Sequence, residues 1–334
     1  MIGKIVNRIS IQLIMSILTM GNAWAMGGVS TPLETGAKID ERVQTVMENN
    51  INTMLETMNA AAEAGLREIK LPKDAFTKEG ADDVKKLWKV SGMSCAVKAL
   101  TARTLNTKTG YQVRGIPVDI MEADPAESRQ ELTIDFDGEG RIAGVSISIG
   151  MERYYELMSA KTSDLDYSRR QIIVDFVENY RTAYNRRDLN FISQVYSDDA
   201  LIIDGHFVNP ASSGMKFESA RMADNQVVYF RYTKNEYLDK LKKEFSNNKF
   251  INVKFEDVEI AQHPKYDDIY GVTLKQYWHT STNNDVGYLF LMIDFHDTDN
   301  PQIQVRTWQP YKYSNGQILS KRDVFHLGSF KIMR

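Results

Sequence analysis

The segment that most constrains the fold is residues 168–205, which joins two helix patterns and a strand pattern without interruption. Ser168 and Gln171 have the spacing of a capping box, in which the serine accepts the amide three residues on and the glutamine reaches back. Asp188 is placed to cap a second, shorter helix. A strand pattern begins at Ala200. Two capped helices leading into a strand predict helices packed against one face of a sheet.

The second half of the chain continues this pattern. The first helix carries an apolar stripe at Ile173, Phe176, Val177, Tyr180 and Tyr184, with the spacing of one helix face. A further capping box at Thr233 and Glu236 opens another helix. Four strand patterns follow, at about 252–262, 269–280, 286–296 and 301–309. An antiparallel sheet of these strands must bury one face against the helices.

The first half shows helix patterns followed by strand patterns. We predict helices within 48–64 and 82–89 and strands near 94–105, 111–121, 129–136 and 141–149. The last two strands alternate apolar and polar residues on either side of an Asp137-Gly138-Glu139-Gly140 turn, which is typical of a hairpin with one buried face. The predicted divisions are a lead-in at 26–40, an α+β domain at 41–158, a second domain at 168–310 and an extension at 311–334.

The first 25 residues differ in composition from the rest of the chain. Lys4 and Arg8 precede a short apolar run, and Ala23-Trp24-Ala25 has the small-x-small pattern of a cleavage site, as in a secretory signal peptide cut after Ala25. A membrane anchor is the alternative, but the run is shorter than the ~20 residues needed to span a bilayer. We therefore expect a periplasmic or secreted protein with no membrane span after cleavage.

Charge and cysteine content exclude several classes of function. Removing Lys4 and Arg8 from the 41 basic residues leaves 39 against 44 acidic ones, a net charge of −5, which disfavours nucleic-acid binding. The one cysteine, Cys95, cannot form an internal disulfide. Its apolar neighbours predict a buried thiol rather than a reactive one.

A faint internal repeat links the two halves. Tyr111 and Val113 recur 159 positions later as Tyr270 and Val272, and the triplet at 134–136 recurs at 293–295. Since both copies lie in a four-strand pattern that follows helices, we expect two related domains. They could form an intrachain pseudo-dimer through their sheets.

The second half resembles the nuclear transport factor 2-like superfamily. The residues that carry the resemblance are YRTAYN at 180–185, YSDDA at 196–200 and VRTW at 305–308. The resemblance spans about 168–310 and implies a cone-shaped α+β domain of helices packed in a curved antiparallel sheet, preceded by a related or cystatin-like domain. The whole chain is also similar to uncharacterised secreted proteins of Bacteroidetes-type bacteria.

This resemblance implies a partly polar cavity inside the cone, of the kind that binds small molecules. Its expected lining is Tyr180, Tyr184, Phe191, Tyr288, Phe290, Met292 and Trp308, although these side chains could simply fill the cone. Placed beside ketosteroid isomerase, Asp204 falls at the proton-abstracting aspartate and Tyr180 at an oxyanion-binding tyrosine. The third acid of that site falls near Leu291, and Gly205 replaces a proline. His206 could be a second base.

Other motifs have the wrong context. The glycines at 138 and 140 lie between two strands, unlike a dinucleotide loop, and the acids at 135–139 lack the closing glutamate of a calcium loop. Asp294, His296, Asp297 and Asp299 could offer metal ligands but are typical of an acidic turn. We therefore expect no cofactor and no metal.

Three functions follow. The first is a non-enzymatic binding protein with a small-molecule or protein partner. The second is a ketosteroid isomerase-like or dehydratase-like enzyme using Asp204 and Tyr180. The third is a structural or cell-surface assembly role with an exposed apolar patch near the extension, where residues 324–327 have strand character.

Overall fold

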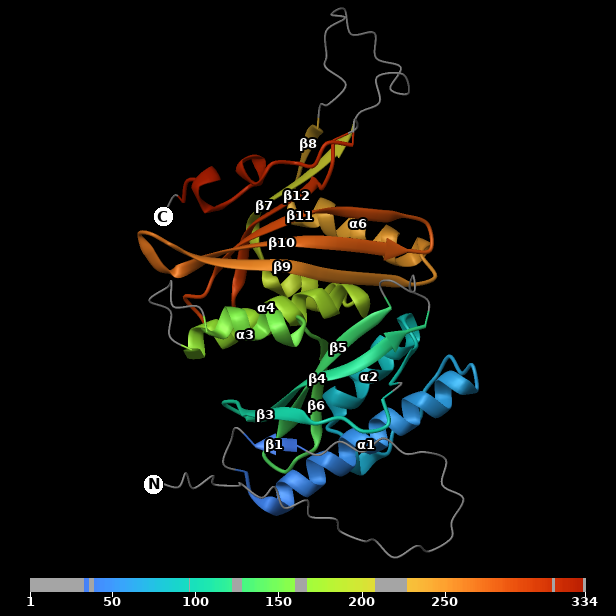
Figure 1. Cartoon of the computed structure of the whole chain (residues 1–334). Coiled ribbons are helices and arrows are strands. Elements are labelled where there is room, and N and C mark those ends of the chain that lie inside the picture. Colours follow the sequence, from blue (N-terminus) through green and yellow to red (C-terminus); the bar gives the residue numbers. More distant parts are fainter. Residues whose placement is uncertain are drawn as a thin grey trace, which may run out of the picture.

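The computed structural model describes residues 33–35, 39–95, 97–121, 128–159, 167–207, 227–313 and 316–332, which form two six-stranded sheets and their helices (Figure 1). The predicted signal peptide, its cleavage site and most of the predicted lead-in lie outside these residues. No helix in the described ranges has both the length and the apolar character needed to cross a bilayer.

The first half builds one sheet in the order β1-β3-β4-β5-β6, with β2 paired to β4. Its elements are β1 (Leu33–Thr35), α1 (Glu41–Glu63), a 3₁₀ turn (Lys73–Ala75), α2 (Lys78–Val90), β2 (Met93–Ser94), β3 (Ala102–Asn106), β4 (Gly110–Ile120), β5 (Arg129–Asp137) and β6 (Ile142–Ile147). The predicted hairpin of β5 and β6 is confirmed. Two differences appear: β1, within the predicted lead-in, pairs in parallel with β3, and Asp40 caps α1 seven residues before the predicted start.

The second half is an α+β unit with a sheet in the order β8-β7-β12-β11-β10-β9. Its elements are α3 (Met151–Ser159), α4 (Tyr167–Asn185), α5 (Leu189–Val195), β7 (Tyr196–Phe207), β8 (Val227–Tyr232), α6 (Lys234–Asn247), β9 (Ile251–His263), β10 (Tyr266–Thr280), β11 (Asn284–Asp294) and β12 (Gln302–Pro310). Strand β12 is parallel to β7, and the other pairs are antiparallel. This is the predicted helix-helix-strand-helix order with its four closing strands, to which α3 and β8 are additions.

Two of the three predicted caps form. Asp188 accepts the Phe191 amide at the start of α5, and Thr233 and Glu236 make the reciprocal capping box of α6. The Ser168 and Gln171 box is wrong, because α4 begins at Tyr167 and residue 168 is already inside it.

The side-chain amide of Gln171 is used in the tertiary structure instead. It donates to Asp175, one turn along α4, and to Gln112 on β4. A local capping pattern cannot anticipate this competing contact, which joins two distant parts of the chain.

The repeated residues occupy equivalent hairpins, β4 with β5 and β10 with β11. Tyr111 pairs with Phe136 in the first hairpin, whereas Tyr270 pairs with Ile293 rather than Phe295 in the second. The registers therefore differ by two residues. A shift of two keeps each side chain on the same face of its sheet.

The two halves meet through α4 instead of face to face through their sheets. Figure 1 shows α3 and α4 between the two sheets, and α4 contacts both β6 and β9. The Arg181 guanidinium of α4 donates to the carbonyls of Ser148 and Val253, one in each half. Thr182 Oγ1 accepts the Ile147 amide at 2.8 Å. The expectation of a pseudo-dimer joined through the sheets is thus corrected, because a polar helix face separates them.

The described residues 311–313 and 316–332, here called the C-terminal strap, cross the outer face of the second sheet. They contain 3₁₀ turns at Lys321–Asp323 and Leu327–Ser329, so the strand character predicted for 324–327 is wrong. The rings of Phe330 and Phe290 stack at 5.7 Å. A side chain on Gly271 would place its Cβ 2.6 Å from Leu327 Cγ, which shows how closely the strap approaches β10. The apolar outer face expected near the extension is therefore covered by the extension itself.

Candidate functional site

The interior of the second half is filled by a cluster of buried tyrosines. Tyr180 of α4 lies with its hydroxyl 2.5 Å from that of Tyr196 and 2.7 Å from that of Tyr184. Tyr184 continues the chain to the Tyr237 hydroxyl of α6 at 2.7 Å. Burial raises the pKa of Tyr184 and of Tyr196 well above the ordinary value, so these hydroxyls stay protonated and satisfy one another. The cone holds a tyrosine network where an open cavity was expected.

Asp204 on β7 is neutralised by two cations. Its Oδ1 lies 2.5 Å from Arg306 Nη1 of β12 and its Oδ2 lies 2.8 Å from Lys240 Nζ of α6. Burial alone would raise the pKa of Asp204, but Arg306 and Lys240 together lower it to about 2. The Arg306 guanidinium also lies 4.8 Å from the centre of the Tyr237 ring. Asp204 is therefore a charged, fully engaged carboxylate and a weak base at neutral pH.

The structure does not bring Asp204 and Tyr180 to one open cavity. Asp204, Arg306 and Tyr237 line a cavity of about 190 Å³, whereas Tyr180 is not among its lining residues. Hydrogen bonds lead from Tyr180 through Tyr184 to Tyr237, and the Arg306 guanidinium contacts both the Tyr237 ring and Asp204. Leu291, at the position of the third acid, is fully buried in the apolar core.

The predicted lining residues divide among three environments. Trp308 borders open space in two neighbouring cavities, and Tyr288 borders a smaller one beside the C-terminal strap. Tyr184 is buried in the core, against which the partly buried Phe191 packs. Phe290 and Met292 were expected in the cone but lie on the opposite face, against the strap.

The phase of β11 explains this correction. Side chains alternate between the faces of a strand, and Leu289, Leu291 and Ile293 are the residues that point toward the helices. Their neighbours must then point outward. The β11 residues that face the cone are therefore 289, 291 and 293, each one position after an expected one.

A groove opens at the end of the second sheet, where β11 begins and β12 ends. A cavity of about 460 Å³ adjoins the 190 Å³ cavity, and the two share His206, Asp285 and Trp308. We call the combined space the mouth groove. The larger cavity is lined by Gly205, His206, Lys275, Tyr277, Asp285, Val286, Trp308, Pro310, Tyr311 and Lys312.

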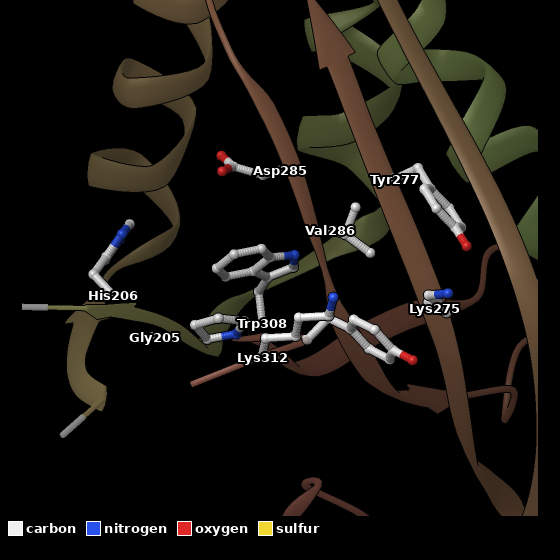
Figure 2. A pocket seen from close by; sticks show the side chains of 10 residues that line it. Gly205, His206, Lys275, Tyr277, Asp285, Val286, Trp308 and Lys312 are labelled. Carbon is white, nitrogen blue, oxygen red and sulfur yellow. The ribbon is translucent and has the colours of Figure 1, made fainter. Parts of the chain in front are cut away.

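The Trp308 indole forms the centre of the mouth groove. Figure 2 shows it between His206 on one side and Val286 and Lys275 on the other. A Cβ on Gly287 of β11 would lie 2.4 Å from the indole Cε2, so only a glycine lets the ring sit directly on the strand. Gly287 therefore fixes the position of the indole at the groove.

The charged groups of the mouth groove are unevenly placed. Lys275 Nζ lies 4.7 Å from the centre of the Tyr277 ring and 4.4 Å from that of Tyr311. Burial, with Lys240 nearby, lowers the pKa of His206, so its ring is neutral at neutral pH. The sequence pointed to Trp308 and His206 but not to Lys275, because a single lysine in a strand belongs to no recognisable motif.

The described residues contain no group of three or more His, Cys, Asp or Glu side chains placed to hold a metal ion. In the turn after β11, the Asp294 carboxylate accepts the His296 amide and the Asp297 carboxylate accepts the Asp299 amide. These acidic side chains therefore stabilise the turn by accepting hydrogen bonds from its backbone amides. Cys95 is buried, as predicted, and burial raises the pKa of its thiol.

No protein-family model and no curated protein sequence matches this chain. A structure from Bdellovibrio bacteriovorus is similar over 62% of this chain and 78% of its own, with 14% identity and a TM-score of 0.33. An NTF2-like protein from Cytophaga hutchinsonii is similar over 98% of its length and 42% of this chain, with 15% identity and a TM-score of 0.30. An uncharacterised protein with a cystatin-like fold from Caulobacter vibrioides is similar over 90% of its length and 46% of this chain, with 9% identity and a TM-score of 0.29. These similarities concern the fold alone.

Proposed function

We propose that this protein is a secreted or periplasmic binding protein, not an enzyme, and that it holds a small molecule in the mouth groove. The observation that carries the proposal is the contrast between Trp308, which borders both cavities, and Asp204, whose two carboxylate oxygens are paired with Arg306 and Lys240. A volume of about 460 Å³ with an aromatic centre suits a small organic ligand. The location follows from the predicted signal peptide.

The competing function is a ketosteroid isomerase-like or dehydratase-like enzyme with Asp204 as general base and Tyr180 as oxyanion donor. A general base works best with a pKa near the operating pH, whereas that of Asp204 is about 2. The enzyme would also need Tyr237 and Tyr184 to move before a substrate could reach the Tyr180 hydroxyl. Both features favour binding over catalysis.

The experiment measures binding of a neutral aromatic probe, 2-naphthol, to the mature protein by saturation-transfer NMR. We expect Trp308→Ala to weaken binding at least tenfold, because it removes the stacking surface. The matched control is Tyr155→Ala, which removes an exposed ring from the middle of α3, outside the mouth groove. Unchanged binding by Trp308→Ala would overturn the mouth groove as the site.

A second measurement separates binding from catalysis. Small molecules that co-purify with the protein are identified by mass spectrometry and incubated with wild type and Asp204→Asn. We expect them to be recovered unaltered from both proteins. Conversion by wild type that is lost in Asp204→Asn, with folding retained, would establish the enzyme instead.

A further inference from the structure

Two lysines gather at one end of the mouth groove, around the ring of Tyr311. Lys275 Nζ lies 4.4 Å and Lys312 Nζ 6.0 Å from the ring centre. Both lysines line the larger cavity, and Figure 2 shows them on the same side of Trp308. They come from distant parts of the sequence, β10 and the start of the C-terminal strap. The fold therefore concentrates positive charge at this end.

Neither lysine has a carboxylate partner among the residues that the structure describes. Glu256 acts on Lys275 electrostatically but forms its ion pair with Lys254, at 2.8 Å, and the Tyr277 hydroxyl is the side-chain hydrogen-bond partner of Lys275. Lys275 is partly buried beside the Tyr277 and Tyr311 rings, and Lys312 is exposed. An anion between the two ammonium groups would gain charge-assisted hydrogen bonds from both.

Away from the two lysines, the larger cavity is lined by a carboxylate, that of Asp285. The Asp285 carboxylate accepts a hydrogen bond from Asn283 at 2.5 Å and has no cationic partner within the described ranges. Its neighbour His206 is neutral, since its pKa is lowered. Asp285 would repel an anion and accept a hydroxyl or amine of the ligand. The charges of the groove thus set one orientation for a bound molecule.

The larger cavity also has apolar lining residues, which are the Trp308 indole, Val286 and Pro310. A planar ring can stack on an indole, as can the apolar face of a sugar ring.

We infer that the ligand of the mouth groove is a ring compound with an anionic substituent, whose flat face lies on Trp308 and whose anion lies between Lys275 and Lys312. The inference rests on the proposed binding function and adds the chemical class of the ligand. Two sources share this chemistry, an aromatic acid and an acidic sugar. The experiment therefore tests an aromatic ring and a sugar ring separately.

The experiment compares matched charged and neutral probes. The aromatic arm uses 2-naphthoate and 2-naphthol, and the sugar arm uses methyl glucuronide and methyl glucoside. We expect the charged member of one pair to bind at least about tenfold more tightly than its neutral partner, as one charge-assisted hydrogen bond predicts. The preference should shrink as salt is added, because exposed charges are screened.

The variant Lys275→Gln with Lys312→Gln should lose this preference and keep binding of the neutral probe. The control, Lys85→Gln with Lys89→Gln, removes two exposed charges from α2 and should change neither. Circular dichroism and thermal unfolding verify that both variants are folded.

The outcomes distinguish the two proposals. Equal, Trp308-dependent binding of charged and neutral probes would overturn the anionic ligand and leave the binding function standing. A preference that survives in the double lysine variant would also overturn it. Absence of Trp308-dependent binding for all four probes would overturn both.

Discussion

Asp204 and Arg306 face each other from the neighbouring parallel strands β7 and β12, with Oδ1 and Nη1 2.5 Å apart and both side chains only 8% exposed. Removing one member of a buried ion pair leaves the other charge uncompensated, which costs about 3 kcal/mol or more. We therefore predict that Asp204→Asn lowers the free energy of unfolding by about 3 kcal/mol, measured by urea denaturation at pH 7.

The matched control for this change is Asp198→Asn. Asp198 also pairs with a lysine, at 2.8 Å from Lys234, but its side chain is 97% exposed. Exposed ion pairs contribute little to stability, so the control should unfold like wild type. If Asp204→Asn were as stable as wild type, the ion pair of Asp204 would not stabilise the fold, and a catalytic role for Asp204 would again be favoured.

Tyr180→Phe tests whether the Tyr180 hydroxyl serves structure or chemistry. This hydroxyl bonds to those of Tyr184 and Tyr196 inside the core. Its loss leaves buried hydroxyls short of a partner, and we expect the free energy of unfolding to fall by about 1 to 2 kcal/mol. Because Tyr180 lines neither cavity of the mouth groove, binding of 2-naphthol should be unchanged.

The comparison variant for Tyr180→Phe is Tyr155→Phe, in which the hydroxyl belongs to an exposed ring. We expect no loss of stability there. A Tyr180→Phe protein with wild-type stability and reduced probe binding would show that the tyrosine network opens to ligand.

Local signals made much of the fold predictable from the sequence. The Asp188 cap and the Thr233–Glu236 box depend on residues within one turn of helix, and the β5–β6 hairpin depends on a short turn with alternating neighbours. Each of these patterns is complete within a few residues. The corresponding elements appear in the structure for that reason.

The face of β11 could not be predicted, because residues 289–293 are all apolar. Alternation gives the phase of a strand only when one face is polar, and here the strap buries the second face. The mouth groove has a similar explanation. Lys275 and Lys312 meet only through the fold, and no spacing in the sequence brings them together.

Two buried carboxyls at the junction of the two halves predict a pH effect on stability. Asp135 of β5 and Asp175 of α4 both accept from Gln112 Nε2, at 2.9 Å and 3.3 Å. The pKa of Asp175 is raised to about 7. Burial is the largest cause, the nearby Glu178 carboxylate adds to it, and Arg114 opposes both. Burial also raises the pKa of Asp135. The two carboxyls therefore hold a proton at pH values where an unfolded aspartate has lost it.

Since the folded pKa of Asp175 lies above the unfolded value of 3.8, this group's contribution to stability is complete below pH 3.8. It is lost as pH rises toward 7. We predict that Asp175→Asn removes this loss and exceeds wild type by about 1 to 2 kcal/mol at pH 8, a value reduced for partial solvent screening. Urea denaturation between about pH 5 and 8 measures the difference.

The control is Asp239→Asn, which removes an exposed carboxylate from α6 and should leave the pH profile unchanged. Equal pH profiles for wild type and Asp175→Asn would contradict the raised pKa of Asp175. A less stable Asp175→Asn protein at every pH would indicate that the charged carboxylate is needed by Arg114.

The contact between Leu327 and Gly271 predicts how firmly the C-terminal strap is held. Leu327 packs with Phe330 over Ile269 and Phe290 on the outer face of the sheet. A carboxylate placed there would be buried without a partner, which is costly.

We predict that Leu327→Asp releases the strap, so that limited trypsin digestion cuts at Lys321 or Arg322 faster than in wild type. The released strap should also increase the binding of a dye for apolar surface. Lys331→Asp also places a carboxylate on the strap, at an exposed position, and should be cut at Lys321 or Arg322 like wild type. Equal digestion of Leu327→Asp and wild type would show that the strap is held by its other contacts, such as the Phe325 amide bonded to Gln309.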